Sequence, residues 1–238
     1  MADNIALELK NIHLRLKSND FEVKILNGID LKVNEGKAVS ILGSSGSGKS
    51  SMMSVMNGLE RQSNGSVMVA GYTLDKMNED ELAIFRRNNI GIILQAFHLI
   101  PTMTAIENVS VPLELAGIKD ASLKAETMLS KVGLDHRMDH YPSQLSGGEQ
   151  QRVAIARAMA PQPKILFADE PTGNLDGKTG HNIIELIFDL KKKTGATLIL
   201  ITHDQELAKK CDEIIHIEDG MIIGNKGVHK NEGKKVVG

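Results

Sequence analysis

A short loop rich in glycine and serine, GSSGSGKS at positions 43–50, constrains the fold of this chain more than any other feature. It follows the apolar run 38–42 and precedes the helix-compatible stretch 51–57, so it joins a buried strand to a helix. Glycines let such a loop curl until its backbone N–H groups and the helix N-terminus face phosphate oxygens. A flexible loop without a ligand is the alternative, but the strand and helix on either side favour a phosphate loop.

The polar residues at the end of this loop add to its backbone donors. Lys49 places a positive charge near the β- and γ-phosphates of a nucleotide, and Ser50 supplies an oxygen ligand for Mg²⁺. The sequence therefore predicts a nucleotide site formed by consecutive residues: Gly43, Ser44, Ser45, Gly46, Ser47, Gly48, Lys49, Ser50 and Ser51.

Short, nearly continuous apolar runs recur along the chain at 38–42, 164–168 and 196–201. Such runs are typical of parallel strands that are buried on both faces. Helical stretches separate them, at 148–160, where Pro161 stops the helix, and at 180–193, where Gly195 follows. This alternation predicts crossover units, and the expected fold class is α/β with a mostly parallel sheet.

The region before the phosphate loop has a different pattern, because apolar residues alternate with polar ones from 5 to 33. A period of two predicts antiparallel strands with one face toward solvent. The alternation shifts from odd to even positions at 10–11, which predicts a bulge, and 18–20 and 27–28 have turn chemistry. We expect an N-terminal antiparallel β-subdomain.

The segment from about 95 to 145 lacks a buried apolar run and carries helix signals instead. Thr104 and Glu107 form a capping-box pattern, Asp120 can cap a second helix, and Gly133 can end it. We therefore expect an α-helical subdomain inserted into the α/β core.

Composition excludes several classes of protein. The 238 residues are 41% hydrophobic and carry a net charge of −2, which allows a large core and gives no basic footprint for nucleic acid. No segment resembles a secretory leader or approaches the roughly 18 apolar residues of a membrane-spanning helix, so a cytoplasmic location is expected. We expect one domain over 1–238 with a flexible tail at about 225–238, and no nucleic-acid partner.

Two adjacent acids, Asp169 and Glu170, follow the apolar run at 164–168. Neighbouring residues on a strand point to opposite faces, so we expect the two carboxylates to serve different purposes. Beside a phosphate loop, Asp169 is expected to hold Mg²⁺ and Glu170 to act on the water that attacks the γ-phosphate. Whether Glu170 removes a proton from that water or only orients it stays open.

A second anion site is expected at the start of a later helix. Its sequence, LSGGEQQR at 145–152, places Ser146 three residues before Glu149 in a capping-box pattern, and Gly147 and Gly148 soften the start. A helix N-terminus of this kind favours an anion. An ordinary capped helix is the alternative. One phosphate loop binds one nucleotide, so a second anion site has no ligand to bind unless it faces another subunit.

In this order the motifs resemble those of the ATP-binding cassette (ABC) ATPases. LSGGEQQR is similar to the family's signature motif, GSSGSGKS to its Walker A motif, and ILFADE at 165–170 to its Walker B segment. Gln95 resembles its Q-loop glutamine, 174–176 its D-loop, and His203 its switch histidine. The resemblance implies a P-loop NTPase core, to which the expected antiparallel β-subdomain and inserted α-helical subdomain belong.

The resemblance also implies cofactors, a partner and residue roles. Members bind ATP and Mg²⁺; Gln95 would sense Mg²⁺ and the attacking water, and His203 would contact the γ-phosphate. From local chemistry alone, the alternative for Gln95 is a strand-end residue satisfied by the backbone, and a lone histidine such as His203 after a buried strand is more often structural than catalytic. Two cassettes of the family close head to tail, so Ser146 and Gly148 of one copy would cap the γ-phosphate held by Lys49 of a second copy.

One position departs from the family pattern. Many cassettes stack adenine on an aromatic residue at the end of the second N-terminal strand, and counting back from the phosphate loop puts Leu16 there. Leu16 offers apolar contact but no ring. We therefore expect weak selectivity for the base, with comparable KM values for ATP and GTP.

The run FADEPTGNLD resembles the subgroup of lipoprotein-release, macrolide-export and bacitracin-resistance transporters. Membership implies an ATPase on the inner face of the cell membrane that powers export or extraction of a lipoprotein, peptide or drug through separate integral membrane subunits. In similar cassettes the region of Phe97, Leu99, Ile100 and Met103 receives the membrane subunit. The subgroup also contains mechanical regulators that signal to cell-wall hydrolases without transport, and no residue discriminates the two.

Overall fold

The larger of two sheets contains the strands predicted from the apolar runs. The structure is a computed structural model that describes residues 4–18 and 21–227, and across them this sheet has six strands in the order β10-β9-β3-β8-β7-β6. Their bounds are β3 (Ala38–Leu42), β6 (Ile90–Leu94), β7 (Ile165–Asp169), β8 (Thr197–Thr202), β9 (Glu213–Glu218) and β10 (Met221–Gly227). Neighbours from β6 to β9 are parallel, and every residue of β3 and β8 is buried, which confirms the prediction.

Strand β10 corrects the expected start of the flexible tail. The sequence predicts a tail from about 225, whereas β10 pairs antiparallel with β9 as far as Gly227. The sequence signal failed here because Gly and Asn, which are depleted in strands, occupy an edge strand. Residues 228–238 lie outside the described part of the chain.

A second sheet of antiparallel strands, in the order β2-β1-β4-β5, confirms the predicted N-terminal pattern. Its strands are β1 (Ile5–Ser18), β2 (Phe21–Asn34), β4 (Asn64–Val69) and β5 (Tyr72–Thr73). The expected bulge is present, because the register shifts between Leu9 and Ile12, where Asn11 has φ 47°. The turn expected at 27–28 is wrong: β2 continues through it, and Gly28, with φ +76°, bulges out of the register.

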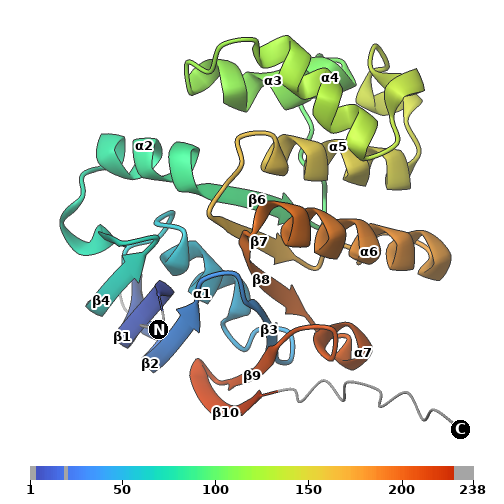
Figure 1. Cartoon of the computed structure of the whole chain (residues 1–238). Coiled ribbons are helices and arrows are strands. Elements are labelled where there is room, and N and C mark those ends of the chain that lie inside the picture. The colour runs from blue at the N-terminus through green and yellow to red at the C-terminus, as the bar shows by residue number, and fades with distance from the viewer. Residues whose placement is uncertain (1–3, 19–20, 228–238) are drawn as a thin grey trace, which may run out of the picture.

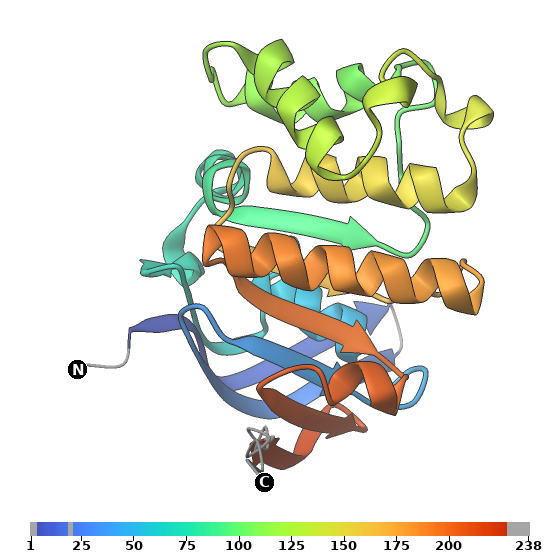
Figure 2. The ribbon, with the colours of Figure 1, turned by 45° about the vertical axis from the view of Figure 1, so that its right-hand side comes forward.

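Helices cover the parallel sheet on both faces, as crossover connections require (Figure 1, Figure 2). These helices are α1 (Lys49–Met56), α2 (Glu79–Asn89), α6 (Gly177–Thr194) and α7 (Gln205–Ala208), with a 3-10 turn at Leu74–Lys76. Gly195 ends α6 in a left-handed conformation, as predicted. Met52 and Met56 of α1 are fully buried in a core shared with Leu7 and Ile41, so α1 joins the two sheets.

The remaining helices form a lobe above the sheet in Figure 1. They are α3 (Ala105–Leu115), α4 (Ala121–Lys131) and α5 (Gly147–Met159), with 3-10 turns at Asp135–Arg137 and Pro142–Gln144. Residues 95–145 contain no strand, and the capping box of Thr104 and Glu107 is present, as predicted. Asp120 makes no side-chain cap, contrary to expectation, because the residue is itself left-handed with φ 58°.

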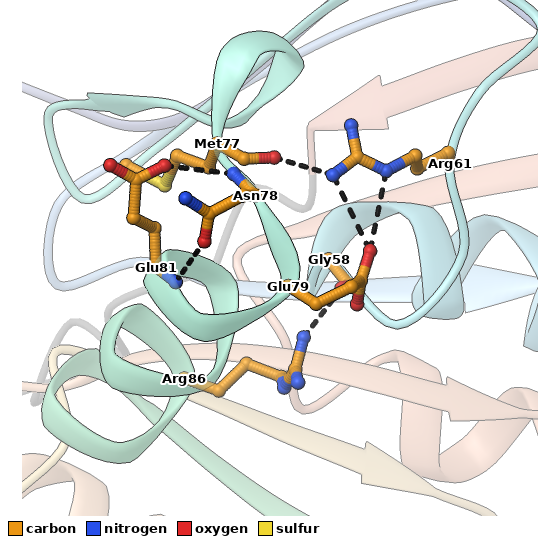
Figure 3. A network of polar contacts seen from close by, with 7 residues as sticks. All are labelled: Gly58, Arg61, Met77, Asn78, Glu79, Glu81 and Arg86. Carbon is orange, nitrogen blue, oxygen red and sulfur yellow. Dashed lines mark hydrogen bonds and ion pairs between the residues drawn. The ribbon is translucent and has the colours of Figure 1, made fainter.

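A polar network holds the end of α1 against α2 (Figure 3). Arg86 donates to the carbonyl oxygen of Gly58 at 2.6 Å. Arg61 donates to the carbonyl oxygen of Met77 at 2.5 Å and forms an ion pair with Glu79 at 3.4 Å. Because the other end of α1 follows the phosphate loop, these contacts fix the direction in which the loop's helix points.

Candidate functional site

The phosphate loop borders a cavity of ≈ 700 Å³ at the carboxyl end of β3. Gly48 has φ 101° directly before α1, a conformation that suits glycine, and no side chain caps the helix. The first N–H groups of α1 therefore stay available to a ligand. The ammonium of Lys49 donates to the carbonyl oxygens of Gly43 at 2.8 Å and Ser44 at 2.7 Å, so it lies folded back over the loop.

Most of the predicted site residues line this one cavity. They are Gly43, Ser44, Ser45, Gly46, Gly48, Lys49, Ser50, Ser51, Gln95, Asp169, Glu170 and His203. Ser47 is buried behind the loop instead, and its Oγ has no hydrogen-bond partner in the described part of the chain.

The loop is supported from the far end of the chain. The N–H of Gly220, in the turn between β9 and β10, donates to the carbonyl oxygen of Ser47 at 3.0 Å, and the N–H of Asn27 donates to the carbonyl oxygen of Gly220 at 2.9 Å. A Cβ on Gly43 would lie 2.4 Å from the carbonyl oxygen of Ile217 in β9. Sequence reasoning missed this support, although the Gly after Asp219 is a hairpin signal.

Asp169 and Glu170 both line this cavity, beside the phosphate loop. The strand β7 ends at Asp169, and Glu170 adopts a left-handed φ of 45°, which interrupts the alternation of a strand. Ser50 Oγ donates to Asp169 Oδ2 at 3.2 Å, and burial raises the pKa of the Asp169 carboxyl above its usual range. His203 Nδ1 lies 2.8 Å from Glu170 Oε1, which joins two predicted catalytic side chains.

Gln95 follows β6 and contacts the segment after Glu170. Its Nε2 donates to Asn174 Oδ1 at 3.2 Å, and Asn174 Nδ2 donates to the backbone oxygen of Gln95 at 3.0 Å. Gly173 gives this pair room, because a Cβ there would lie 2.6 Å from Gln95 Nε2. Asn174 and Gly173 are site residues whose roles sequence reasoning left unassigned.

Arg157 of α5 holds the backbone just after Gln95. Its guanidinium donates to the carbonyl oxygens of His98 at 2.6 Å and Phe97 at 2.8 Å. Both of these residues are left-handed, with φ 60° for Phe97 and 48° for His98. Burial lowers the pKa of Arg157, yet a guanidinium stays charged at neutral pH. No sequence signal indicates this contact.

The predicted second anion site lies at the start of α5, outside the phosphate cavity. Ser146 and Glu149 form the expected capping box, in which the Ser146 N–H donates to Glu149 Oε2 at 2.8 Å and the Glu149 N–H donates to Ser146 Oγ at 3.3 Å. The backbone N–H of Ser146 lowers the pKa of Glu149, and Arg137 pairs with the same carboxylate at 3.0 Å. Gly147 and Gly148 complete this helix start, and none of these residues lines the cavity around Lys49.

Leu16 is also separate from the phosphate cavity. Its side chain is 47% exposed at the end of β1, where it borders another open cavity with Arg15 and Glu22. Ile25 of β2 lines the phosphate cavity in its place. Leu16 is therefore an exposed apolar side chain that the fold leaves available for contact.

The donor set in the phosphate cavity fits a hard cation. Ser50 supplies a hydroxyl, Asp169 a carboxylate and Gln95 an amide oxygen, and Mg²⁺ binds such oxygen ligands while it keeps several waters. Among the described residues, no group of three or more His, Cys, Asp or Glu could hold a metal ion by itself. The oxygens of Ser50, Asp169 and Gln95 fit a metal that is bound together with a phosphate ligand, as nucleotide-bound Mg²⁺ is.

None of the helices in the described part of the chain combines the length and the hydrophobicity that a membrane span requires.

Comparisons with known proteins agree with these motifs. The sequence profile of the family described as "ABC transporter" matches residues 26–173. An uncharacterized ABC transporter ATP-binding protein, YbbA of Escherichia coli K12, is 43% identical over 93% of this chain and 97% of that protein. The lipoprotein-releasing system ATP-binding protein LolD of Geobacter metallireducens is 42% identical over 92% of this chain and 98% of that protein.

A solved structure shares the fold as well. The dimeric, post-hydrolysis structure of the ATP-binding cassette MJ0796, bound to ADP and Pi, has a TM-score of 0.87 and 37% sequence identity, and the match covers 94% of this chain and 99% of that one. The fold is thus that of an ABC ATPase cassette, an α/β P-loop NTPase. The chain belongs to the ABC transporter family, as one of its ATP-binding proteins.

Proposed function

We propose that this chain hydrolyses ATP with Mg²⁺ in the cavity around the phosphate loop. The observation that carries the proposal is the convergence of Lys49, Ser50, Asp169, Glu170 and His203 on one cavity, from the ends of the parallel strands β7 and β8 and the start of α1. Magnesium, when bound, supplies charge neutralisation at the phosphates.

The protein's own side chains divide the remaining work. Lys49 binds the β- and γ-phosphates, while Ser50, Asp169 and Gln95 hold the metal. Glu170 acts on the attacking water, and His203, which lies 2.8 Å from its carboxylate, fixes that carboxylate and contacts the γ-phosphate. The direct test is ATPase activity of Lys49→Ala and Glu170→Gln, both of which should lose hydrolysis, whereas only Lys49→Ala should lose ATP binding.

We propose further that two copies close head to tail, so that Ser146, Gly147, Gly148 and Glu149 of one copy cap the phosphate bound at Lys49 of the other. The separation of the start of α5 from the phosphate cavity within one chain supports this arrangement. The dimeric structures of MJ0796 support it too.

The dimer is tested by light scattering on a sizing column. Glu170→Gln with ATP and Mg²⁺ should elute as a dimer. The matched control, Glu170→Gln with Ser146→Arg, should bind ATP yet remain monomeric, because the added side chain lies across the interface. A dimer in this control, or a monomer in Glu170→Gln alone, would contradict the arrangement.

The ATP cycle is proposed to power export or extraction of a lipoprotein-type substrate through separate integral membrane subunits, with this chain on the cytoplasmic face of the membrane. The names of three LolD relatives, which are 41% to 42% identical to this chain, support a lipoprotein over a peptide or drug. Mild solubilisation of membranes that hold tagged, ATP-trapped Glu170→Gln should recover an integral subunit. Recovery of cell-wall hydrolase regulators instead would contradict transport.

A further inference from the structure

We propose that Asn174 sets the orientation of the Gln95 side-chain amide, so that its oxygen and not its nitrogen is offered to the metal in the phosphate cavity. The inference rests on the proposed MgATP site. It assigns a positioning role to a residue that acts through Gln95 and does not itself touch the ligand.

The orientation follows from a chain of hydrogen bonds that has only one consistent solution. The backbone oxygen of Gln95 can only accept, so the group of Asn174 that lies 3.0 Å from it must be the donor, Nδ2. The other end of the same side chain, Asn174 Oδ1, can only accept and lies 3.2 Å from the Gln95 amide. Gln95 must therefore present Nε2 to Asn174.

Because Gln95 Nε2 donates to Asn174, Gln95 Oε1 is the amide atom that is left to bind a cation. In the described part of the chain, Gln95 Oε1 accepts no hydrogen bond, and Gln95 lines the same cavity as Ser50 and Asp169. A metal cation binds the oxygen of an amide and is repelled by its NH2 group. If the amide were reversed, Oε1 would face Asn174 Oδ1, and two acceptors would oppose each other.

Gly173 also affects the orientation of the Gln95 amide, because it leaves room for that amide beside Asn174. A Cβ at this position would lie 2.6 Å from Gln95 Nε2 and 2.9 Å from Gln95 Cδ, so any side chain here pushes the amide away from Asn174. Gly173 is not left-handed, so Gly173→Ala adds this steric contact without backbone strain.

The test compares the affinity of the full chain for a non-hydrolysable ATP analogue with Mn²⁺ and without metal, because the ratio isolates the contribution of the metal. Binding is measured by fluorescence of a labelled analogue, and protein-bound Mn²⁺ by electron paramagnetic resonance. Asn174→Ala and Gly173→Ala should each lower the ratio about three- to tenfold, the size of one lost hydrogen bond.

Gln95→Glu provides the matched background. A carboxylate offers oxygen at both ends, so Asn174→Ala should lower the ratio less than twofold in Gln95→Glu. An equal loss in both backgrounds, or no loss in Asn174→Ala while the unaltered chain binds metal with nucleotide, would overturn the amide orientation alone. An unaltered chain whose nucleotide affinity is independent of Mn²⁺ would overturn the proposed MgATP site together with it.

Discussion

Arg157 offers the sharpest test of how the region after Gln95 is held. Its two hydrogen bonds, at 2.6 Å and 2.8 Å, end on the carbonyl oxygens of His98 and Phe97, and both of these residues are left-handed. A hydrogen bond from a charged group contributes about 1.5–3 kcal/mol to stability. Arg157→Leu removes two such bonds and therefore roughly 3–6 kcal/mol of stabilisation.

Part of this loss is offset by relaxation of the backbone. A left-handed residue with a side chain costs about 1–2 kcal/mol, so release of Phe97 and His98 returns roughly 2–4 kcal/mol. We therefore expect Arg157→Leu to lower the free energy of unfolding by only about 1–2 kcal/mol while it abolishes the local structure after Gln95.

Two measurements separate these effects. Urea unfolding gives the global change, and amide hydrogen exchange at 96–99 reports the local one. Arg152→Leu is the matched control on the same helix, because it removes a hydrogen bond of 2.9 Å to the carbonyl oxygen of Val132 and leaves this segment alone. Exchange at 96–99 that is equally slow in Arg157→Leu and in the unaltered protein would refute the reasoning.

Three further changes test other parts of the site. Gly43→Ala should lower the free energy of unfolding by about 1–3 kcal/mol or more, because its Cβ would lie 2.4 Å from a backbone oxygen, and urea unfolding measures this. Leu16→Tyr should lower the KM for ATP by about two- to tenfold through stacking, whereas the unaltered chain should show comparable KM values for ATP and GTP; a strong ATP preference in the unaltered chain would contradict this. The pKa of Glu149 in the folded protein is lowered, chiefly by the backbone N–H of Ser146. The ionised carboxylate therefore contributes its full stabilisation above the usual carboxyl pKa of about 4.3. This stabilisation is lost as the pH falls through the lowered pKa of the folded state. The stability difference between the unaltered chain and Glu149→Gln should therefore shrink between pH 6 and pH 3, and a constant difference would argue against the capping role.

Features with local causes were predictable from the sequence. Apolar runs in the sequence predict the fully buried strands β3 and β8. The capping boxes at Thr104 and Ser146 depend on residues only three positions apart. The phosphate loop belongs to the same class, because its glycines and the flanking strand and helix are contiguous.

Features with distant causes were not predictable. Gln95 and Asn174 are 79 positions apart, and their pairing depends on β6 and β7 lying side by side. The left-handed backbone of Glu170, with φ 45°, was not predictable either, because residues with a side chain rarely adopt it. Asn225 lies in a segment whose composition is typical of a flexible terminus, but it is part of a strand because it pairs with Ile215 of β9.

The contact between Gly220 and Ser47 has a consequence for the order in which the protein matures during synthesis. The loop at 43–50 leaves the ribosome early, yet the turn that holds Ser47 is made more than 170 residues later, and β9 must insert beside β3 before that turn can reach it. A nascent chain that lacks the last hairpin therefore carries the whole Walker A sequence without its support. Nucleotide capture is therefore expected to begin only after β9, β10 and the turn between them have been made and have reached the loop.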